Sequence, residues 1–131
     1  MPPSIKVLEH DGIAAPMGHY SNAVVAGDTL YVSGLLPTDE SGTLVGEGDT
    51  GLQAKCVFDN LGRVLGAAGS HPSHVARITV YMRNIGERMR MNEARKEFFG
   101  EHRPAATLIE VSGLARPDFL VEVDAIAILG R

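Results

Sequence analysis

The sequence predicts an α+β fold in which two helices cover one face of a mixed six-stranded sheet. Three observations support this prediction. Two short apolar runs are joined by a Gly-Asp turn, two segments with helical periodicity flank an alternating strand, and two further strands follow. The predicted order is strand, hairpin, helix, strand, helix and two strands. Helices that cross between strands in this order are expected on one face of the sheet.

The first hairpin is predicted in the stretch SNAVVAGDTLYVSGLLP. Its strands are expected over residues 21–26 and 29–35, joined by Gly27 and Asp28. Apolar residues on both sides of such a dipeptide are a strong short-range hairpin signal.

A first helix is predicted to begin at Asp49 or Thr50, because either side chain can cap it, and to end near Gly69. Gly62 and Gly66 lie inside this helix and weaken it, which suggests the close approach of another backbone. The apolar stripe that predicts the helix consists of Ala54, Val57, Phe58, Leu61, Val64, Leu65 and Ala68.

The second half of the chain alternates again. A strand is expected over residues 77–83, a helix over about 86–101, and strands over 107–112 and 119–129. The basic residues between positions 83 and 95 are interrupted by glutamates, so we interpret them as a solvated helix face rather than an anion site.

The last strand has two different faces. One is apolar throughout, whereas the other carries Glu122 and Asp124 between Leu120 and Ile126. This second face is either exposed to solvent or packed in an oligomer, and its long aliphatic run favours the oligomer. The two carboxylates either raise one pKa by repulsion or point to separate solvated pockets, and we favour separate pockets.

Composition excludes several functional classes. The 131 residues suit one domain spanning 1–131, and 44% apolar with 21% charged residues is typical of a globular protein. A net charge of −4 disfavours a nucleic-acid partner, because such binding needs clustered cations. The stretch MPPSIKVLEH has no apolar core of a signal peptide, and no segment approaches the roughly 18 apolar residues of a membrane span. We therefore expect a cytoplasmic protein with no membrane partner.

Metal and thiol chemistry are not indicated. His71 and His74 have a spacing that resembles a ligand pair, but no third ligand can be assigned nearby, so no metal site is predicted. Cys56 is the single cysteine, and its place in an apolar stripe predicts a buried small hydrophobe.

Five segments resemble the Rid family (YjgF/RidA-like imine and enamine deaminases), in order and over nearly the whole chain. They are MGHYSNAV, LYVSGLLP, FDNLGRVLGAAGS, HVARITVYMRNIGERMRMNEARKEFF and RPAATLIEVSGLARPDFLVEVDAIA. The strongest local matches are Ser33-Gly34, the segment from Asn92 that ends in two phenylalanines, and the VEVDAIA ending. The resemblance implies a chorismate-mutase-like (YjgF-like) protomer in a homotrimer, with a cleft between each pair of neighbouring subunits. Packing in this trimer would cover the aliphatic sheet face.

The resemblance also implies a reaction. Deaminating members hydrolyse an enamine or imine, such as 2-aminoacrylate, to a keto acid and ammonia without metal or cofactor. Carried onto this chain, Glu122 positions the attacking water and moves a proton, Tyr20, Ser33 and Gly34 shape the pocket, and Asn92 supports it. Aliphatic neighbours are expected to raise the pKa of Glu122, which suits proton exchange.

The match to the family breaks at one position. Deaminating members read P-A-R-S/T, whereas this chain reads Pro104-Ala105-Ala106-Thr107, so Ala106 stands where the family's carboxylate-binding arginine stands. Loss of that arginine is expected to cost on the order of a hundredfold or more with a 2-imino acid. The backbone of Thr107 and Leu108 is expected to line the cleft.

Two residues are candidates to supply the missing charge. Arg103 lies in a loop stiffened by Pro104 and either reaches the cleft or remains at the surface or at a trimer contact, which we favour. His19 either acts as a cation or proton donor, or is an exposed loop histidine.

The sequence therefore predicts a hydrolase that deaminates an imine or enamine other than 2-aminoacrylate, with extra room at Ala106 for a bulkier group. The alternative is a non-catalytic trimer that binds a small ligand or a partner. A ribonuclease role is disfavoured by the acidic charge and by the lack of a suitably placed histidine pair.

Overall fold

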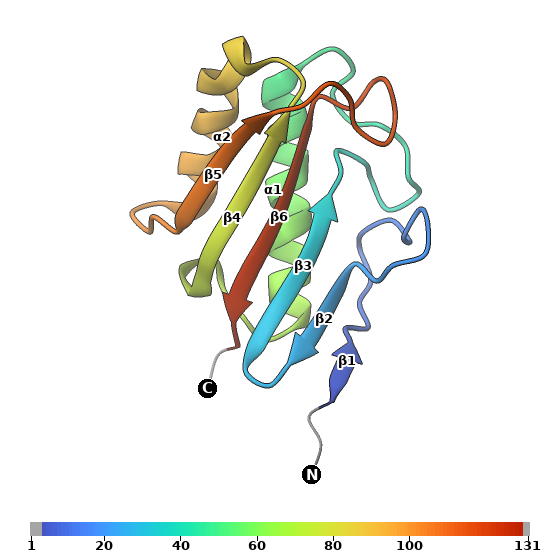
Figure 1. Ribbon diagram of the computed structural model, residues 1–131, viewed down its shortest axis with the longest axis vertical. Coiled ribbons are helices and arrows are strands. Elements are labelled where there is room, and N and C mark those ends of the chain that lie inside the picture. Colours follow the sequence, from blue (N-terminus) through green and yellow to red (C-terminus); the bar gives the residue numbers. More distant parts are fainter. Residues whose placement is uncertain (1–3, 130–131) are drawn as a thin grey trace.

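The computed structural model describes residues 4–129, and residues 1–3 and 130–131 of the predicted 1–131 domain lie outside this range. Its centre is a six-stranded sheet with the strand order β1-β2-β3-β6-β4-β5 (Figure 1). Only β4 and β5 pair in parallel, and every other neighbouring pair is antiparallel, so the sheet is mixed as predicted. The strands are β1 (Ile5–Val7), β2 (Ala23–Ala26), β3 (Thr29–Leu35), β4 (Val75–Met82), β5 (Ala105–Glu110) and β6 (Val121–Ile128).

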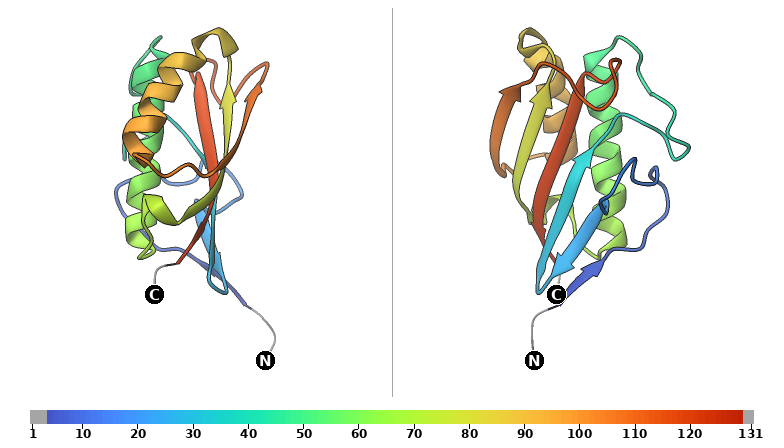
Figure 2. Two further views of the ribbon diagram at one scale, coloured as in Figure 1. Left: turned by 90° about the vertical axis from the view of Figure 1, so that its left-hand side faces the viewer. Right: turned by 45° about the vertical axis from the view of Figure 1, so that its right-hand side comes forward.

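Both α-helices, α1 (Thr50–Ala67) and α2 (Arg88–Phe99), lie on the same face of the sheet, which confirms the predicted layers (Figure 2). Short 3-10 turns, η1 (Pro72–His74) and η2 (Ile85–Glu87), lead into β4 and α2. The core lies between these two layers. Its largest fully buried side chains include Phe58, Leu61, Leu30, Ile78 and Met82.

The helix termini follow from their caps. Asp49 caps α1 by accepting a hydrogen bond from the Leu52 N–H, so the first of the two predicted starts is the cap itself. Helix α2 is shorter than predicted, because the turn η2 precedes it and Gly100, with a φ of 63°, ends it.

The late strands begin at positions other than the predicted ones. Strand β5 starts at Ala105 rather than at residue 107, because Ala105 already pairs with Arg77 of β4. Strand β6 starts at Val121 rather than at residue 119. The Phe119 N–H donates to the Arg116 carbonyl in a turn, and the Leu120 N–H donates to the Gln53 side chain.

The helices meet through aromatic rings rather than through glycine. Phe58 of α1 stacks on Phe98 and meets Phe99 edge-on, with centroids 5.5 Å and 5.9 Å apart. The expected close backbone approach at the two helix glycines is wrong. A Cβ on Gly62 would meet the Phe98 ring at 3.2 Å, and a Cβ on Gly66 would meet nothing within 4 Å.

The face of the sheet opposite the helices remains open in the single chain. It carries Tyr31, Ile109 and Ile128, which are 46%, 39% and 53% exposed. In residues 4–129 no helix is long and apolar enough to cross a membrane.

Candidate functional site

A β-bulge in β3 creates the centre of the site. Val32 pairs with Ala125 of β6 and Leu35 pairs with Val123, so Ser33 and Gly34 together lie opposite the single residue Asp124. The Ser33 N–H donates to the Asn22 carbonyl, and its hydroxyl donates to the Ser21 carbonyl at 2.6 Å. The serine therefore ties the bulge to the segment that precedes β2.

Gly34 makes room for the carboxylate of Glu122. A Cβ at position 34 would overlap a Glu122 carboxylate oxygen and would lie 2.6 Å from Cδ and 3.0 Å from Cγ. Any side chain at position 34 would thus displace the glutamate. The glycine is needed here for space, because its φ is not in the left-handed region.

The local environment raises the pKa of Glu122. Burial of the half-buried carboxyl is the larger cause, and the charge of Asp124 is the second. The Tyr81 hydroxyl donates to Asp124 Oδ2 at 2.8 Å, and this hydrogen bond is the main reason why the pKa of Tyr81 is raised. A raised carboxyl pKa brings proton exchange closer to neutral pH, as expected from the aliphatic neighbours.

Both carboxylates line one groove of about 780 Å³ on the open face of the sheet. The interpretation that they point to separate pockets is therefore wrong, because the two residues lie two apart on the same face of β6 and line the same groove. The groove is walled by Tyr20, Tyr31, Ser33, Gly34 and Ile126, among others.

The loop before β2 covers one end of this groove. Met17, Gly18 and Tyr20 line it, and the Met17 N–H donates to the Tyr20 hydroxyl at 3.2 Å. His19 is exposed and is not among the groove residues.

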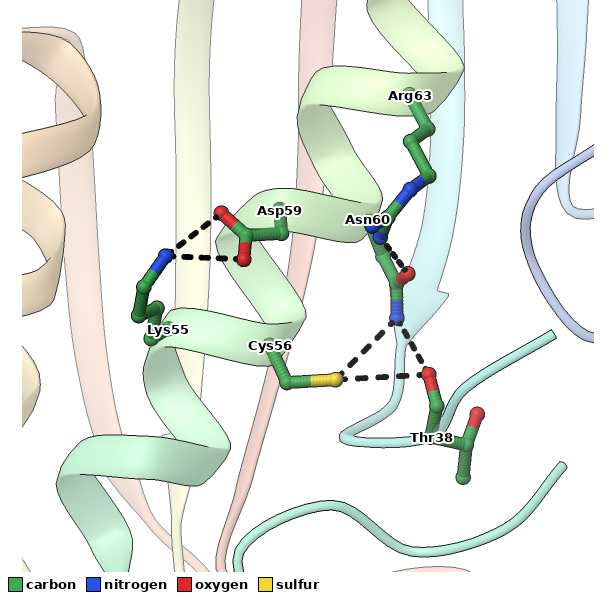
Figure 3. Close-up of polar contacts among 6 residues, drawn as sticks. All are labelled: Thr38, Lys55, Cys56, Asp59, Asn60 and Arg63. Atoms are coloured by element: carbon green, nitrogen blue, oxygen red, sulfur yellow. Dashed lines mark hydrogen bonds and ion pairs between the residues drawn. The ribbon is translucent and has the colours of Figure 1, made fainter.

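Two buried polar side chains of α1 hold the segments that flank the site. The Asn60 amide donates to the carbonyls of Leu36 and Thr38, both at 3.0 Å. Figure 3 shows its bond to Thr38 and the Cys56 thiol, which donates to the same carbonyl. Asn60 in turn accepts a hydrogen bond from Arg63 at 2.9 Å. The chain that leaves the bulge is thereby fixed to the helix.

Gln53 plays the same role at the start of β6. Its amide donates to the carbonyls of Gly46 and Asp118, and its oxygen accepts from the Leu120 N–H at 2.7 Å. The bond to Leu120 lies two residues before Glu122, so it fixes the register in which the glutamate enters the groove.

Cys56 is buried, and burial raises the pKa of its thiol, which confirms the prediction of a small core residue. Within residues 4–129 no group of three or more His, Cys, Asp or Glu side chains could hold a metal ion. The His71 ring faces its own turn and accepts a hydrogen bond from the Ser73 N–H.

The remaining predicted site residues lie elsewhere in the protomer. Asn92, Arg103 and Ala106 line a separate pocket between α2 and the start of β5. Thr107 and Leu108 line neither pocket. Thr107 accepts a hydrogen bond from Arg77 on the open face, whereas Leu108 packs against the core. One protomer thus divides the predicted set between the open face over β3 and β6 and a pocket between α2 and the edge strand β5.

Sequence reasoning missed the supporting residues for different reasons. Gln53 and Asn60 interrupt the apolar stripe of α1, and this interruption was a visible signal for buried polar anchors. Tyr81 pairs with Glu122 only through the register of β4 and β6, which leaves no local signal in the sequence.

Comparison with known proteins identifies both the fold and the family of this chain. A crystal structure of a Rid-family protein from Yersinia pestis superposes with a TM-score of 0.91 at 30% identity, covering 96% of this chain and 100% of that one. The sequence model of the family described as Endoribonuclease L-PSP matches residues 12–129. The chain therefore belongs to this family, which includes the YjgF, RutC and Rid proteins.

Two relatives have named activities. The 3-aminoacrylate deaminase RutC of Acinetobacter baylyi is 31% identical over 122 residues, which cover 93% of this chain and 96% of the relative. The 2-iminobutanoate/2-iminopropanoate deaminase of Rattus norvegicus is 34% identical and covers 95% of this chain and 90% of its own length. The family thus contains deaminases of enamines and imines.

Proposed function

We propose that this protein hydrolyses a reactive imine or enamine to a carbonyl compound and ammonia, with Glu122 as the acid and base. The observation that carries the proposal is the Glu122 carboxyl, half-buried against Gly34 in an open groove, with a raised pKa. The deaminase activities of two relatives support it.

The chemistry follows from one carboxyl group. Ionised Glu122 accepts a proton from water while the water oxygen forms a bond to the carbon of the protonated imine. The carboxyl then gives this proton to nitrogen. The C–N bond breaks as the C=O bond forms, the ionised Glu122 carboxylate accepts the hydroxyl proton, and ammonia leaves. Release of that proton to solvent returns Glu122 to its ionised form. Tyr20 and Ser33 shape the groove, and the raised pKa of Glu122 helps its carboxyl both to accept and to give the proton.

The proposed active assembly is a homotrimer with its clefts between subunits. The exposed apolar residues of the open sheet face support burial against a second copy, since such a face is rarely left in water. In a cleft between subunits, the Glu122 groove of one subunit would meet the Asn92 and Ala106 edge of the next. Light scattering should give a mass near three times the 14.0 kDa of one chain, and a monomer mass would contradict the proposal.

The proposed substrate is not 2-aminoacrylate. Ala106 cannot bind a carboxylate as an arginine does, and such a charge-assisted pair contributes roughly 1.5 to 3 kcal/mol per hydrogen bond. The space beside Ala106 instead suits a bulkier group, and the side chain is exposed in the pocket that it lines.

An ammonia-release assay tests the function. Imines are generated in situ by amino-acid and amine oxidases, and the native protein is compared with Glu122→Gln. We expect the native protein to accelerate hydrolysis of at least one bulky imine and the variant to lose 10²-fold or more, which is about the contribution of a general acid–base group. Equal rates for both proteins on every imine would remove the enzyme proposal and leave the non-catalytic binding module.

A further inference from the structure

A second pocket, of about 420 Å³, lies between the C-terminal half of α2 and the start of β5. It contains positively charged side chains and lacks acidic ones among its lining residues. Its polar and charged lining consists of Asn92, Arg95, Lys96, His102 and Arg103. Ala106 adds only a methyl group, so the pocket keeps the space that a longer side chain would fill.

Local structure builds this pocket from two directions. On α2, the Asn92 side-chain oxygen accepts two hydrogen bonds from the Arg95 guanidinium, at 3.1 Å from Nε and 2.6 Å from Nη2. Gly100 then turns the chain back toward the sheet, and the His102 ring donates from Nε2 to the Val75 carbonyl at 2.7 Å. The backbone that carries Arg103 is thereby held opposite α2.

The positive charge of the pocket is not neutralised by a neighbour. Within residues 4–129 the ion pairs are Lys55–Asp59 and Arg90–Glu87, so Arg95 and Arg103 have no carboxylate partner. Arg95 bonds to a neutral amide, which orients its guanidinium and leaves its charge intact.

The other arginines near the two pockets are engaged elsewhere. Arg77 donates to Thr107 on the open face of the sheet, and Arg83 donates to the Pro117 carbonyl. Arg116 donates to the Gly42 carbonyl and stacks over the Phe119 ring at 4.9 Å. The basic stretch at residues 83–95 was interpreted from the sequence as a solvated helix face. In the structure its last arginine, Arg95, instead lines a pocket.

We propose that this pocket binds a doubly charged oxyanionic group, a phosphate or a dicarboxylate, through Arg95 and Arg103, with Lys96 at its rim. Planar guanidinium groups match such oxygens in a bidentate manner, and several converging cations favour a dianion over a single carboxylate. This proposal rests on the proposed function. The anionic group is part of the substrate and lies apart from the imine carbon. The cations project from α2 and the loop before β5, whereas Ala106 of β5 contributes none.

Anion binding can be measured without turnover. Amide NMR spectra of the native protein are recorded during titration with inorganic phosphate, succinate and acetate at constant ionic strength. We expect shifts in residues 92–106, tighter binding of phosphate and succinate than of acetate, and a Kd raised on the order of tenfold or more in Arg95→Gln and in Arg103→Gln. Arg90→Gln is the matched control, because Arg90 lies on the same helix and pairs with Glu87 outside the pocket.

Several results would overturn the proposal. These are an equal Kd in all four proteins, shifts that map outside residues 92–106, and acetate binding as tightly as the dianions. A stronger response to phosphate than to succinate would identify a phosphate group, and the reverse would identify a dicarboxylate, with either outcome supporting the pocket.

Turnover separates this proposal from the proposed function. An uncharged imine, generated from benzylamine by an amine oxidase, should be hydrolysed equally by the native protein and Arg90→Gln, while Glu122→Gln is inactive. Loss of Glu122-dependent turnover with intact anion binding would contradict the proposed function alone, and the opposite result would contradict the anion pocket alone.

Discussion

Gly34→Ala tests whether the position of the Glu122 carboxylate controls activity. The added Cβ would lie 2.6 Å from Glu122 Cδ, whereas carbon atoms in contact prefer about 3.5 to 4.0 Å. The carboxylate must therefore move by about 1 Å or more. A displacement of this size costs on the order of 10²-fold in rate when it affects a reacting group.

The same change should have a small effect on stability. Overpacking in a core costs about 1 to 3 kcal/mol, but here the displaced group is the end of a side chain that borders an open groove. We expect kcat/KM for imine hydrolysis to fall about 100-fold, with a loss of unfolding free energy at or below the lower end of that range. The assays are ammonia release and urea unfolding.

Gly66→Ala is the matched control. It makes the same chemical change on an exposed turn of α1, where the new Cβ meets nothing within 4 Å. We expect unchanged kcat/KM and a gain of about 0.5 to 1 kcal/mol in stability, because alanine favours the helix. Full activity of Gly34→Ala, or equal losses in both variants, would refute the role given to the glycine.

Three further predictions concern charge. Because the pKa of Glu122 is raised in the folded protein, the ionised carboxylate destabilises the fold. Glu122→Gln should therefore resist urea better than the native protein at pH 7. Below the ordinary glutamate pKa of about 4.3, where the carboxyl is neutral in both states, this difference should vanish. Asp124→Asn removes the second cause of that raised pKa, so the acidic limb of the kcat/KM profile should move to lower pH, and an unmoved limb would contradict the coupling. Ala106→Arg should gain roughly tenfold or more in ammonia release from 2-aminoacrylate, and no gain would show that this position does not face the substrate.

The layers of the fold could be predicted because they depend on periodicity. The stripe of α1 and the alternation of β4 and β6 each define a buried face, and the structure buries the predicted residues except Ala68, which follows α1 and is only partly buried. Strand starts were less predictable. The first residues of the predicted last strand are bonded to a turn and to Gln53, and these interactions connect distant parts of the sequence.

The parts of the candidate site that a short sequence motif defines could be predicted. The parts that the register of the sheet defines could not. Ser33 and Gly34 form the bulge, and Glu122 lies against it. Alternation places Glu122 and Asp124 on one face of β6, but the other groove walls, from β3 and the loop before β2, come from distant parts of the sequence. The position of Arg95 in a pocket depends on the return of the chain after Gly100, so a reading of α2 as an isolated helix misses it.

The central place of β6 has a consequence for how the protein is made. Within residues 4–129 this strand follows the other five, yet it lies between β3 and β4 and pairs with both. During synthesis, the two halves of the sheet cannot join until the strand that separates them emerges from the ribosome. Such long-range pairing slows folding and leaves strand edges uncovered in the meantime. The residue proposed to do the chemistry, Glu122, is thus delivered by the segment that completes the fold.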